Sequence, residues 1–446
     1  MHNTIAAIAT AHGVSSISII RVSGEAALSV AHKISKRETI TPRYAHLTSL
    51  YNADDNLIDQ AIMIYFAAPY SFTGEEIVEF QCHGGMIVAQ EILDTILSFG
   101  VRLAEPGEFS KRAFLNGKID LSEAEAISKL IEAKSVDAAK ILAKQMKGEL
   151  KIFVEESREA LLRSLAYSEV MIDYAEEDIP DDIMQSIVAQ LDALTQKIEQ
   201  IVDASHRRRG LIEGFKVAIV GKPNVGKSSL LNALLSYDRA IVSDIAGTTR
   251  DTIEEQVRIG SHMIRLVDTA GIRDSEDTIE KIGIERSLSS IEDADVVVAL
   301  FDVSRPFDEE DAKIVSILKS LQEKHIIVAL NKTDLERKLV LEHMEAYDTV
   351  EVSAKKAFVK LTEKLEKLFD TIGEGEELML ISARQIEAVQ QAKKSILEAK
   401  EPLLNGELEF FSYHLQEAVK AISSISKPYD SEEILDKMFG EFCLGK

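Results

Sequence analysis

The chain has 446 residues, of which 46% are hydrophobic and 28% are charged, and its formal net charge is -24. This composition is typical of a soluble globular protein, and the length predicts two or three structural units, because a single hydrophobic core stops growing below this size. The net charge argues against diffuse binding to nucleic acid, since repulsion from the phosphates opposes it.

The N-terminal stretch MHNTIAAIATAHGVSSISIIRVSG lacks the basic start of a signal peptide, and no apolar run reaches the roughly 18 residues that suggest a membrane span. The only two cysteines, Cys82 and Cys443, lie far apart in the sequence, which does not indicate a disulfide framework. We therefore expect a cytoplasmic protein.

Two short basic runs are candidates for a local RNA contact: His206-Arg207-Arg208-Arg209, and Lys111-Arg112 with Lys118. The alternative interpretation of each run is a solvated charged face. Because the chain is acidic, any RNA contact is expected to be local or assisted by a partner.

The first 118 residues mix strand and helix patterns. Residues 17–22 (ISIIRV), 61–66 (AIMIYF) and 77–82 (IVEFQC) predict strands, and residues 86–99 predict an amphipathic helix. We expect an α+β domain over residues 1–118.

From residue 119 to residue 212 the pattern becomes helical. Glycine almost vanishes, apolar residues recur at helical spacing, and the helices are expected to break near Ile179-Pro180. The same periodicity returns after residue 375, over residues 383–399, 408–424 and 431–439. Residues 119–212 and 376–446 are therefore predicted to be two halves of one all-α helical domain.

Between these halves, residues 213–375 alternate strands and helices. The strand segments are KVAIV, HMIRLVDTAG, ADVVVALFD, HIIVALNKTD and TVEVSAK, and SSLLNALL is helical. This alternation predicts a mostly parallel sheet with helices on both faces, in an α/β domain inserted into the helical one.

Residues 221–228 (GKPNVGKS) match the phosphate-binding pattern GxxxxGK[ST], between an apolar strand and a helix. Backbone amides at the glycines can turn toward phosphates, Lys227 supplies a charge at the β and γ phosphates, and the Ser228 hydroxyl can bind magnesium. The expected nucleotide contacts are Asn224, Val225, Gly226, Lys227, Ser228 and Ser229.

The base is predicted to be guanine. Residues 331–334 (NKTD) follow a strand, and the Asp334 carboxylate can accept hydrogen bonds from the ring N–H and the exocyclic amine of guanine, a donor pair that adenine lacks. Asn331 and Lys332 belong to the same motif. Residues 353–355, which are Ser353, Ala354 and Lys355, follow the next strand and fit a supporting loop.

Two segments are expected to sense the γ phosphate and to become ordered with GTP. The first offers hydroxyls for magnesium and a flexible backbone, and its expected contacts are Ser243, Asp244, Ile245, Ala246, Gly247, Thr248 and Thr249. The second offers an acid and a mobile amide, and its residues are Asp268, Thr269, Ala270 and Gly271.

The position after Gly271 raises a question about catalysis. Many GTP-hydrolysing proteins have a glutamine there to orient the attacking water, but this chain has Ile272, which cannot bind water. The following segment DSEDTIE offers four acidic candidates, and the residues alone leave the choice open among Asp274, Glu276, Asp277 and Glu280.

Segments along the whole chain closely resemble the MnmE (TrmE) tRNA modification GTPase family. They are SIIRVSG, SFTGEEIVEFQCHGG, PGEFSKRAFLNGKIDLSEAEA, GKPNVGKSSLLN, DIAGTTRD, DTAGIRD, IEKIGIERS and the terminal FCLGK. The three-part layout, with a Ras-like domain inserted into a helical one, is also the family's arrangement.

The resemblance implies a homodimer that works with an FAD-dependent partner of the MnmG (GidA) type in a heterotetramer. Together they install an aminomethyl-type (carboxymethylaminomethyl) group on carbon 5 of the wobble uridine of tRNA. The one-carbon unit comes from a 5-formyl- or methylene-tetrahydrofolate, and GTP hydrolysis accompanies the reaction. The GTPase domains pair across the nucleotides, and a potassium ion replaces an arginine finger.

The resemblance also implies roles for residues in the nucleotide site. Potassium would be bound by Asn224 together with Ser243, Ile245 and Thr248, and Thr249 would join Ser228 on magnesium. Glu280 would be the acid that orients the water. A cation at the phosphates can offset the charge that develops in the transition state.

For the folate, the resemblance implies Arg21, Glu79 and Lys118 in the first domain and Lys446 at the C-terminus. A glutamate can accept from the pterin's guanidine-like edge, and basic groups can pair with the glutamyl carboxylates. Cys443 is a candidate catalytic nucleophile or a passive small residue, and Cys82 is expected to pack in the core.

A rival hypothesis is a GTP-dependent switch of the ribosome-assembly type, which carries out no bond chemistry. The first domain, with Arg21, Glu79 and Lys118, distinguishes the two hypotheses, because a plain switch does not need it.

Overall fold

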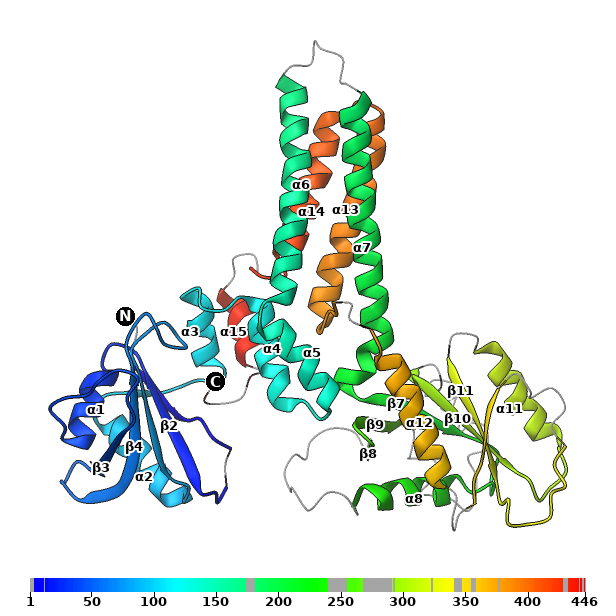
Figure 1. Ribbon diagram of the computed structural model, residues 1–446, viewed down its shortest axis with the longest axis horizontal. Helices are drawn as coiled ribbons and strands as arrows, with labels where there is room; N and C mark the ends of the chain where they lie inside the picture. Colours follow the sequence, from blue (N-terminus) through cyan, green and yellow to red (C-terminus); the bar gives the residue numbers. More distant parts are fainter. Residues whose placement is uncertain are drawn as a thin grey trace. The chain divides into compact units, whose positions relative to one another are not determined.

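The computed structural model of the chain is shown in Figure 1. The structure describes residues 4–11, 13–173, 181–239, 255–267, 291, 293–321, 324–340, 347–353, 358–375, 378–427, 432–440, 442 and 445. The chain forms two compact units: Met1–Ile131, Gln145–Asp192 and Glu387–Lys446 make the first, and Glu132–Lys144 and Ala193–Ile386 make the second. Each unit is described separately.

The first unit begins with a six-stranded sheet in the order β3-β4-β5-β2-β1-β6. The strands are β1 (Ile5–Ile8), β2 (Ile17–Ser23), β3 (His46–Tyr51), β4 (Leu57–Phe66), β5 (Ile77–His83) and β6 (Arg102–Leu103). All pairings are antiparallel except that of β1 with β6. The helices are α1 (Ala27–Ser35), α2 (Met86–Ser98) and α3 (Glu108–Leu115).

The two faces of this sheet have different partners. Ile20 and Val22 of β2 pack with Val30 of α1 and Ile92 of α2 in one large core. Successive side chains of a strand point to opposite faces, so Arg21 belongs to the other face. Around Phe109 of α3 a small second cluster forms with Ile5, Ala7 and Ala104. The α+β prediction is confirmed, and the second face is where charged side chains gather.

Long helices complete the first unit. They are α4 (Leu121–Glu132), α6 (Glu149–Asp173), the start of α7 (Asp181–Glu213), most of α13 (Ala383–Leu404), α14 (Leu408–Ser423) and α15 (Glu432–Gly440). Helices α6 and α14 lie side by side (Figure 1), and the hydroxyls of Ser168 and Ser412 are hydrogen bonded at 2.8 Å. These helices confirm the predicted helical content, while the expected break at Ile179-Pro180 lies outside the described residues.

The second unit contains a six-stranded sheet in the order β12-β11-β10-β7-β9-β8. The strands are β7 (Phe215–Val220), β8 (Glu255–Ile259), β9 (His262–Val267), β10 (Val296–Asp302), β11 (His325–Asn331) and β12 (Asp348–Glu351). Only β8 runs antiparallel to its neighbour. The helices are α5 (Val136–Met146), α8 (Lys227–Arg239), α11 (Glu309–Ser320) and α12 (Phe358–Gly373), together with the rest of α7 and the start of α13.

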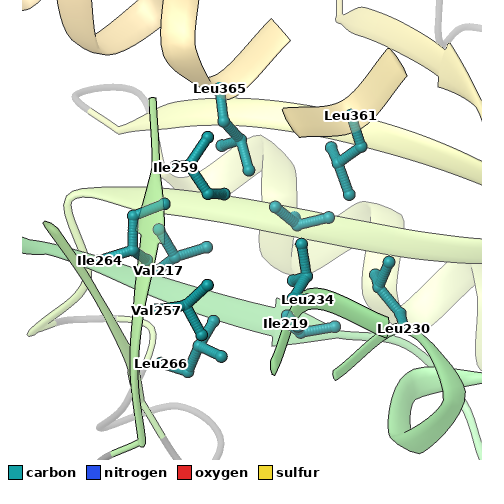
Figure 2. A pocket seen from close by; sticks show the side chains of 11 residues that line it. Val217, Ile219, Leu230, Leu234, Val257, Ile259, Ile264, Leu266, Leu361 and Leu365 are labelled. Atoms are coloured by element: carbon teal, nitrogen blue, oxygen red, sulfur yellow. The ribbon is translucent and has the colours of Figure 1, made fainter. Parts of the chain in front are cut away.

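Helices cover both faces of this sheet, as predicted. Leu230 of α8 and Leu365 of α12 belong to one core, and Leu318 of α11 belongs to the core on the other face. Figure 2 shows a small cavity inside the first core, lined entirely by aliphatic side chains such as Val217 and Leu234. Such a cavity offers no polar partner for a nucleotide, which must bind at the strand ends instead.

Within the part of the chain that the structure describes, we find no helix long and apolar enough to span a bilayer. The domain boundaries at residues 118, 212 and 375 stay predictions, because the border between the two compact units passes through α7 and α13.

Candidate functional site

The phosphate loop connects β7 to α8, as the sequence predicts. Asn224 and Gly226 have φ angles of 63° and 105°, in the left-handed region that favours glycine. At Gly221 a Cβ would lie 2.6 Å from the carbonyl oxygen of Leu300, so no side chain fits there. The loop therefore leads into the N-terminus of α8, where backbone amides can receive phosphate oxygens.

Lys227 begins α8 and reaches back over this loop. Its Nζ donates to the carbonyl oxygens of Gly221 at 2.6 Å and of Lys222 at 3.0 Å. Burial lowers the pKa of Lys227, and the carboxylate of Glu310 acts in the opposite direction. The ammonium is thus held at the place where the motif puts the β and γ phosphates. Ser228 and Ser229 follow it in the first turn of α8 and are exposed.

The base-recognition residues lie directly beside the phosphate loop. The side-chain amide of Asn331 donates to the carbonyl oxygen of Val225 at 2.7 Å. Lys332 donates to the carbonyl oxygen of Asn224 at 3.3 Å. A Cβ at Gly226 would lie 2.3 Å from Nδ2 of Asn331, so this glycine is required for the contact. The tertiary structure joins two motifs that are about 100 residues apart in sequence.

Asp334 and Ser353 come from neighbouring parallel strands. Asp334 follows β11 and is exposed, and Ser353 follows β12 and is buried. The hydroxyl of Thr333 donates to the carbonyl oxygen of Val352 at 3.2 Å and links the two loops. This arrangement leaves the Asp334 carboxylate accessible to a base. Ala354 and Lys355 lie outside the described residues.

Sequence reasoning missed Asp302, which ends β10 and is 2% exposed. Its carboxylate accepts from Nζ of Lys332 at 2.6 Å and from the hydroxyl of Ser304 at 2.6 Å. Burial raises the pKa of Asp302, but the hydrogen bonds from Lys332 and Ser304 outweigh it and leave the pKa below its ordinary value. The sequence feature that could have identified Asp302 is its place at the end of the apolar strand segment ADVVVALFD.

Several predicted nucleotide contacts lie outside the described residues. These are Ser243, Asp244, Ile245, Ala246, Gly247, Thr248, Thr249, Asp268, Thr269, Ala270, Gly271 and Glu280. Their assignments stay predictions.

In the first unit, Arg21 and Glu79 form an ion pair across β2 and β5. The strand register places the two residues opposite each other, and Nε of Arg21 donates to Oε1 of Glu79 at 2.8 Å. The Arg21 guanidinium lies 5.8 Å from the ring centroid of Phe72 and 5.6 Å from that of Phe109. The side chains of Arg21 and Glu79 are 22% and 16% exposed, so the pair is reachable from solvent but largely enclosed.

Lys118 and the C-terminal segment approach the same domain at other points. A Cβ at Gly74 would lie 3.0 Å from Cε of Lys118, so this lysine lies against the loop that contains Phe72. A Cβ at Gly445 would lie 2.6 Å from the carbonyl oxygen of Ile8, at the end of β1. Gly445 therefore lies against the end of β1 in the N-terminal sheet. Cys443 and Lys446 themselves lie outside the described residues.

Cys82 is a core residue, as predicted. It is 2% exposed, and burial, followed by the nearby Asp59 carboxylate, raises the pKa of its thiol to about 11. The thiol therefore stays protonated at neutral pH and is a poor nucleophile.

The two basic runs are candidates for a local RNA contact, but their central arginines, Arg112 and Arg208, are buried and offer no open positive surface. Arg112 is 8% exposed and pairs with Glu75 at 3.0 Å and Glu108 at 2.9 Å. Arg208 is 6% exposed. Glu108 lies one helical turn before Arg112, but Glu75 is distant in sequence, and a local pattern cannot indicate that second partner.

Fold and site together define a P-loop protein that binds a guanine nucleotide. Two family models match the chain, GTP-binding protein TrmE N-terminus over residues 4–118 and MnmE helical domain over residues 121–443. The chain belongs to the MnmE family of tRNA modification GTPases and is a GTP-hydrolysing enzyme of that family.

Relatives named tRNA modification GTPase MnmE match over essentially the full length of both chains. The protein of Sulfurovum sp. (strain NBC37-1) is 83% identical over 446 residues, which are 100% of this chain and 99% of the relative. The proteins of Sulfurimonas denitrificans (strain ATCC 33889 / DSM 1251) and Aliarcobacter butzleri (strain RM4018) are 58% and 56% identical, each over 100% of this chain and 99% of the relative.

Proposed function

We propose that this GTPase acts on tRNA with an FAD-dependent partner of the MnmG type. The pair installs a carboxymethylaminomethyl-type group on carbon 5 of the wobble uridine. The one-carbon unit comes from a 5-formyl- or methylene-tetrahydrofolate bound in the first domain, and GTP hydrolysis accompanies the modification.

The observation that carries the folate part is the ion pair of Arg21 and Glu79, with the Arg21 guanidinium 5.8 Å from the ring centroid of Phe72 and 5.6 Å from that of Phe109, and with Lys118 against the loop that contains Phe72. A carboxylate suits the pterin edge, basic groups suit the glutamyl carboxylates, and the rings of Phe72 and Phe109 supply apolar surface. A plain nucleotide switch has no use for such a site. Lys446 completes the proposed set of residues.

For hydrolysis we propose that Asn224, with Ser243, Ile245 and Thr248, binds potassium, and that Ser228 and Thr249 bind magnesium. Asn224 fits this role because it is exposed at the tip of the phosphate loop and offers an amide oxygen, a ligand that hard cations accept. The cations supply positive charge at the phosphates, and Glu280 orients the water.

The assembly we propose is a homodimer that joins two partner proteins in a heterotetramer in the cytoplasm. The net charge of -24 and the ion pairs of Arg112 favour a tRNA site that the partner supplies for the most part. Cys443 remains a candidate catalytic nucleophile.

The test is titration of the full chain with 5-formyltetrahydrofolate by calorimetry. We expect binding that Arg21→Ala and Glu79→Gln each weaken about tenfold or more, since each removes a charged hydrogen bond. Lys33→Ala is the matched control, because it removes a charge from α1 on the opposite side of the sheet. Absence of folate binding to the wild-type chain supports the rival ribosome-assembly switch.

A further inference from the structure

Lys222 follows the first glycine of the phosphate loop, at a position where the motif GxxxxGK[ST] accepts any residue. Its side chain is only 5% exposed. Nζ lies 2.6 Å from Oδ2 of Asp308 and 2.7 Å from Oδ2 of Asp311. A buried ammonium is stable only with close, well-oriented partners, so this contact is a specific one.

Both carboxylates belong to the N-terminus of α11 and are fixed there by their own hydrogen bonds. Asp308 caps the helix and accepts from the amides of Glu310 and Asp311 at 3.1 Å each. Asp311 in turn accepts from the amide of Asp308 at 3.3 Å, and it is 1% exposed. Lys222 is therefore held by the two acids of a capping box, of which Asp311 is buried and Asp308 is exposed.

The main chain of the same segment holds Lys227. The carbonyl oxygens of Gly221 and Lys222 both accept from Nζ of Lys227. On its other side, Gly221 is packed closely against the carbonyl oxygen of Leu300. The side chain of Lys222 thus anchors the segment to α11 while its carbonyl directs the lysine that meets the phosphates.

Lys222 also has an electrostatic effect on nucleotide binding. Without its ammonium, Asp308 and Asp311 are two uncompensated carboxylates beside the phosphate loop, and Glu310 of the same turn already acts electrostatically on Lys227. Repulsion from them is stronger for GTP than for GDP, because GTP carries more negative charge.

We propose that Lys222 is a positioning residue for GTP binding and hydrolysis. Its ion pairs with Asp308 and Asp311 hold residues 221–222 where Lys227 can meet the phosphates, and they remove negative charge from the loop's surroundings. The proposal concerns the nucleotide alone, so its test is independent of folate and of the partner protein.

The test is titration of the full chain with fluorescent analogues of GTP and GDP, at a temperature where circular dichroism shows each variant to be folded. We expect Lys222→Met to weaken GTP binding about 10- to 100-fold, GDP binding by a smaller factor, and to lower turnover. Lys222→Arg keeps a cation able to pair with both carboxylates and retains GTP affinity within about threefold. Lys313→Met, which removes an exposed charge from α11, leaves affinity unchanged.

A double variant separates positioning from fold stability. Lys222→Met with Asp311→Leu replaces the buried pair by apolar groups, which generally leaves stability intact. A melting temperature like that of the wild type with GTP affinity and turnover still reduced supports the proposal. Recovery of both affinity and turnover in this double variant overturns the positioning role, because it assigns the loss in Lys222→Met to uncompensated negative charge alone. A loss in Lys222→Arg equal to that in Lys222→Met overturns the proposal as well.

Discussion

The side-chain amide of Asn331 donates a hydrogen bond of 2.7 Å to the carbonyl oxygen of Val225, across 106 positions of sequence. Gly226 makes this contact possible, since any Cβ there would overlap the Asn331 side chain. The base-recognition loop and the phosphate loop are therefore joined, and the two ends of the nucleotide site keep a fixed separation.

Replacing Asn331 by alanine tests this connection. The residue is 4% exposed, so Asn331→Ala leaves a buried carbonyl without its donor, at a cost of about 1–3 kcal/mol. We expect GTP and GDP affinity to fall together by about tenfold or more. Thr333→Val is the control, because it removes only the bond to Val352 from the same loop. Equal losses in the two variants contradict the joined-loop interpretation.

The exposed carboxylate of Asp334 is the predicted determinant of the choice of base. In Asp334→Asn the side chain gains an N–H donor, which suits the C2 oxygen of xanthine and repels the exocyclic amine of guanine. We expect the affinity for GTP to fall about 100-fold and the affinity for XTP to rise, measured by competition with a labelled nucleotide. Glu336→Gln, an exposed neighbour, should change neither affinity. If Asp334→Asn still prefers GTP as the wild type does, Asp334 does not recognise the base.

Glu280 is the proposed water-orienting acid. Glu280→Ala should lower GTP turnover by roughly 10² to 10³, which corresponds to about 3 to 4 kcal/mol of transition-state stabilisation, with nucleotide affinity nearly unchanged. The matched control is Glu276→Ala, which removes an acid from the same segment. If Glu280→Ala retains wild-type turnover, measured as phosphate release, Glu280 is not the acid that orients the water.

Potassium should accelerate hydrolysis through Asn224. Sodium is smaller and fits the same oxygens poorly, so turnover and pairing of GTPase domains are expected to fall when sodium replaces potassium. Asn224→Gly tests the ligand, because glycine tolerates the φ of 63° at this position and lacks the amide oxygen. The difference in phosphate release between the two salts should vanish in this variant. If the wild type releases phosphate at equal rates in both salts, Asn224 does not bind an activating potassium ion.

Glu108 should stabilise the first domain in a pH-dependent way. Burial raises its pKa, but hydrogen bonds from Arg102, the Glu105 amide and Arg112 together leave it below 4.5. A lowered folded-state pKa gives stability that is present above 4.5 and is lost as pH falls through the folded-state pKa.

We therefore expect Glu108→Gln to be less stable by about 1–3 kcal/mol at neutral pH, with the difference from wild type shrinking in acid. Calorimetric melting of both proteins over a pH series measures this difference in stability. Glu105→Gln, at an exposed neighbouring position, serves as control. A deficit that is constant with pH shows that the charge of Glu108 is not its source.

Local patterns predicted much of this protein. Strand 77–82 and helix 86–99 match β5 and α2 within one residue at their ends, because alternation and helical spacing are encoded in adjacent residues. The phosphate loop was predicted because its motif is also a run of adjacent residues. Strands β1, β3 and β8 were missed, because strand formation depends on pairing and packing in the sheet more than on the residues of the segment itself.

By itself, the sequence determined the fold class, the phosphate-binding and guanine-binding motifs, and the family resemblance, since each is written in short contiguous segments. Only the tertiary structure decided which charges are paired. Arg112 is neutralised by Glu75, Lys222 by Asp308 and Asp311, and Lys332 by Asp302. The energy of a buried charge depends on partners that chain folding brings within a few ångströms, and no local pattern specifies those partners.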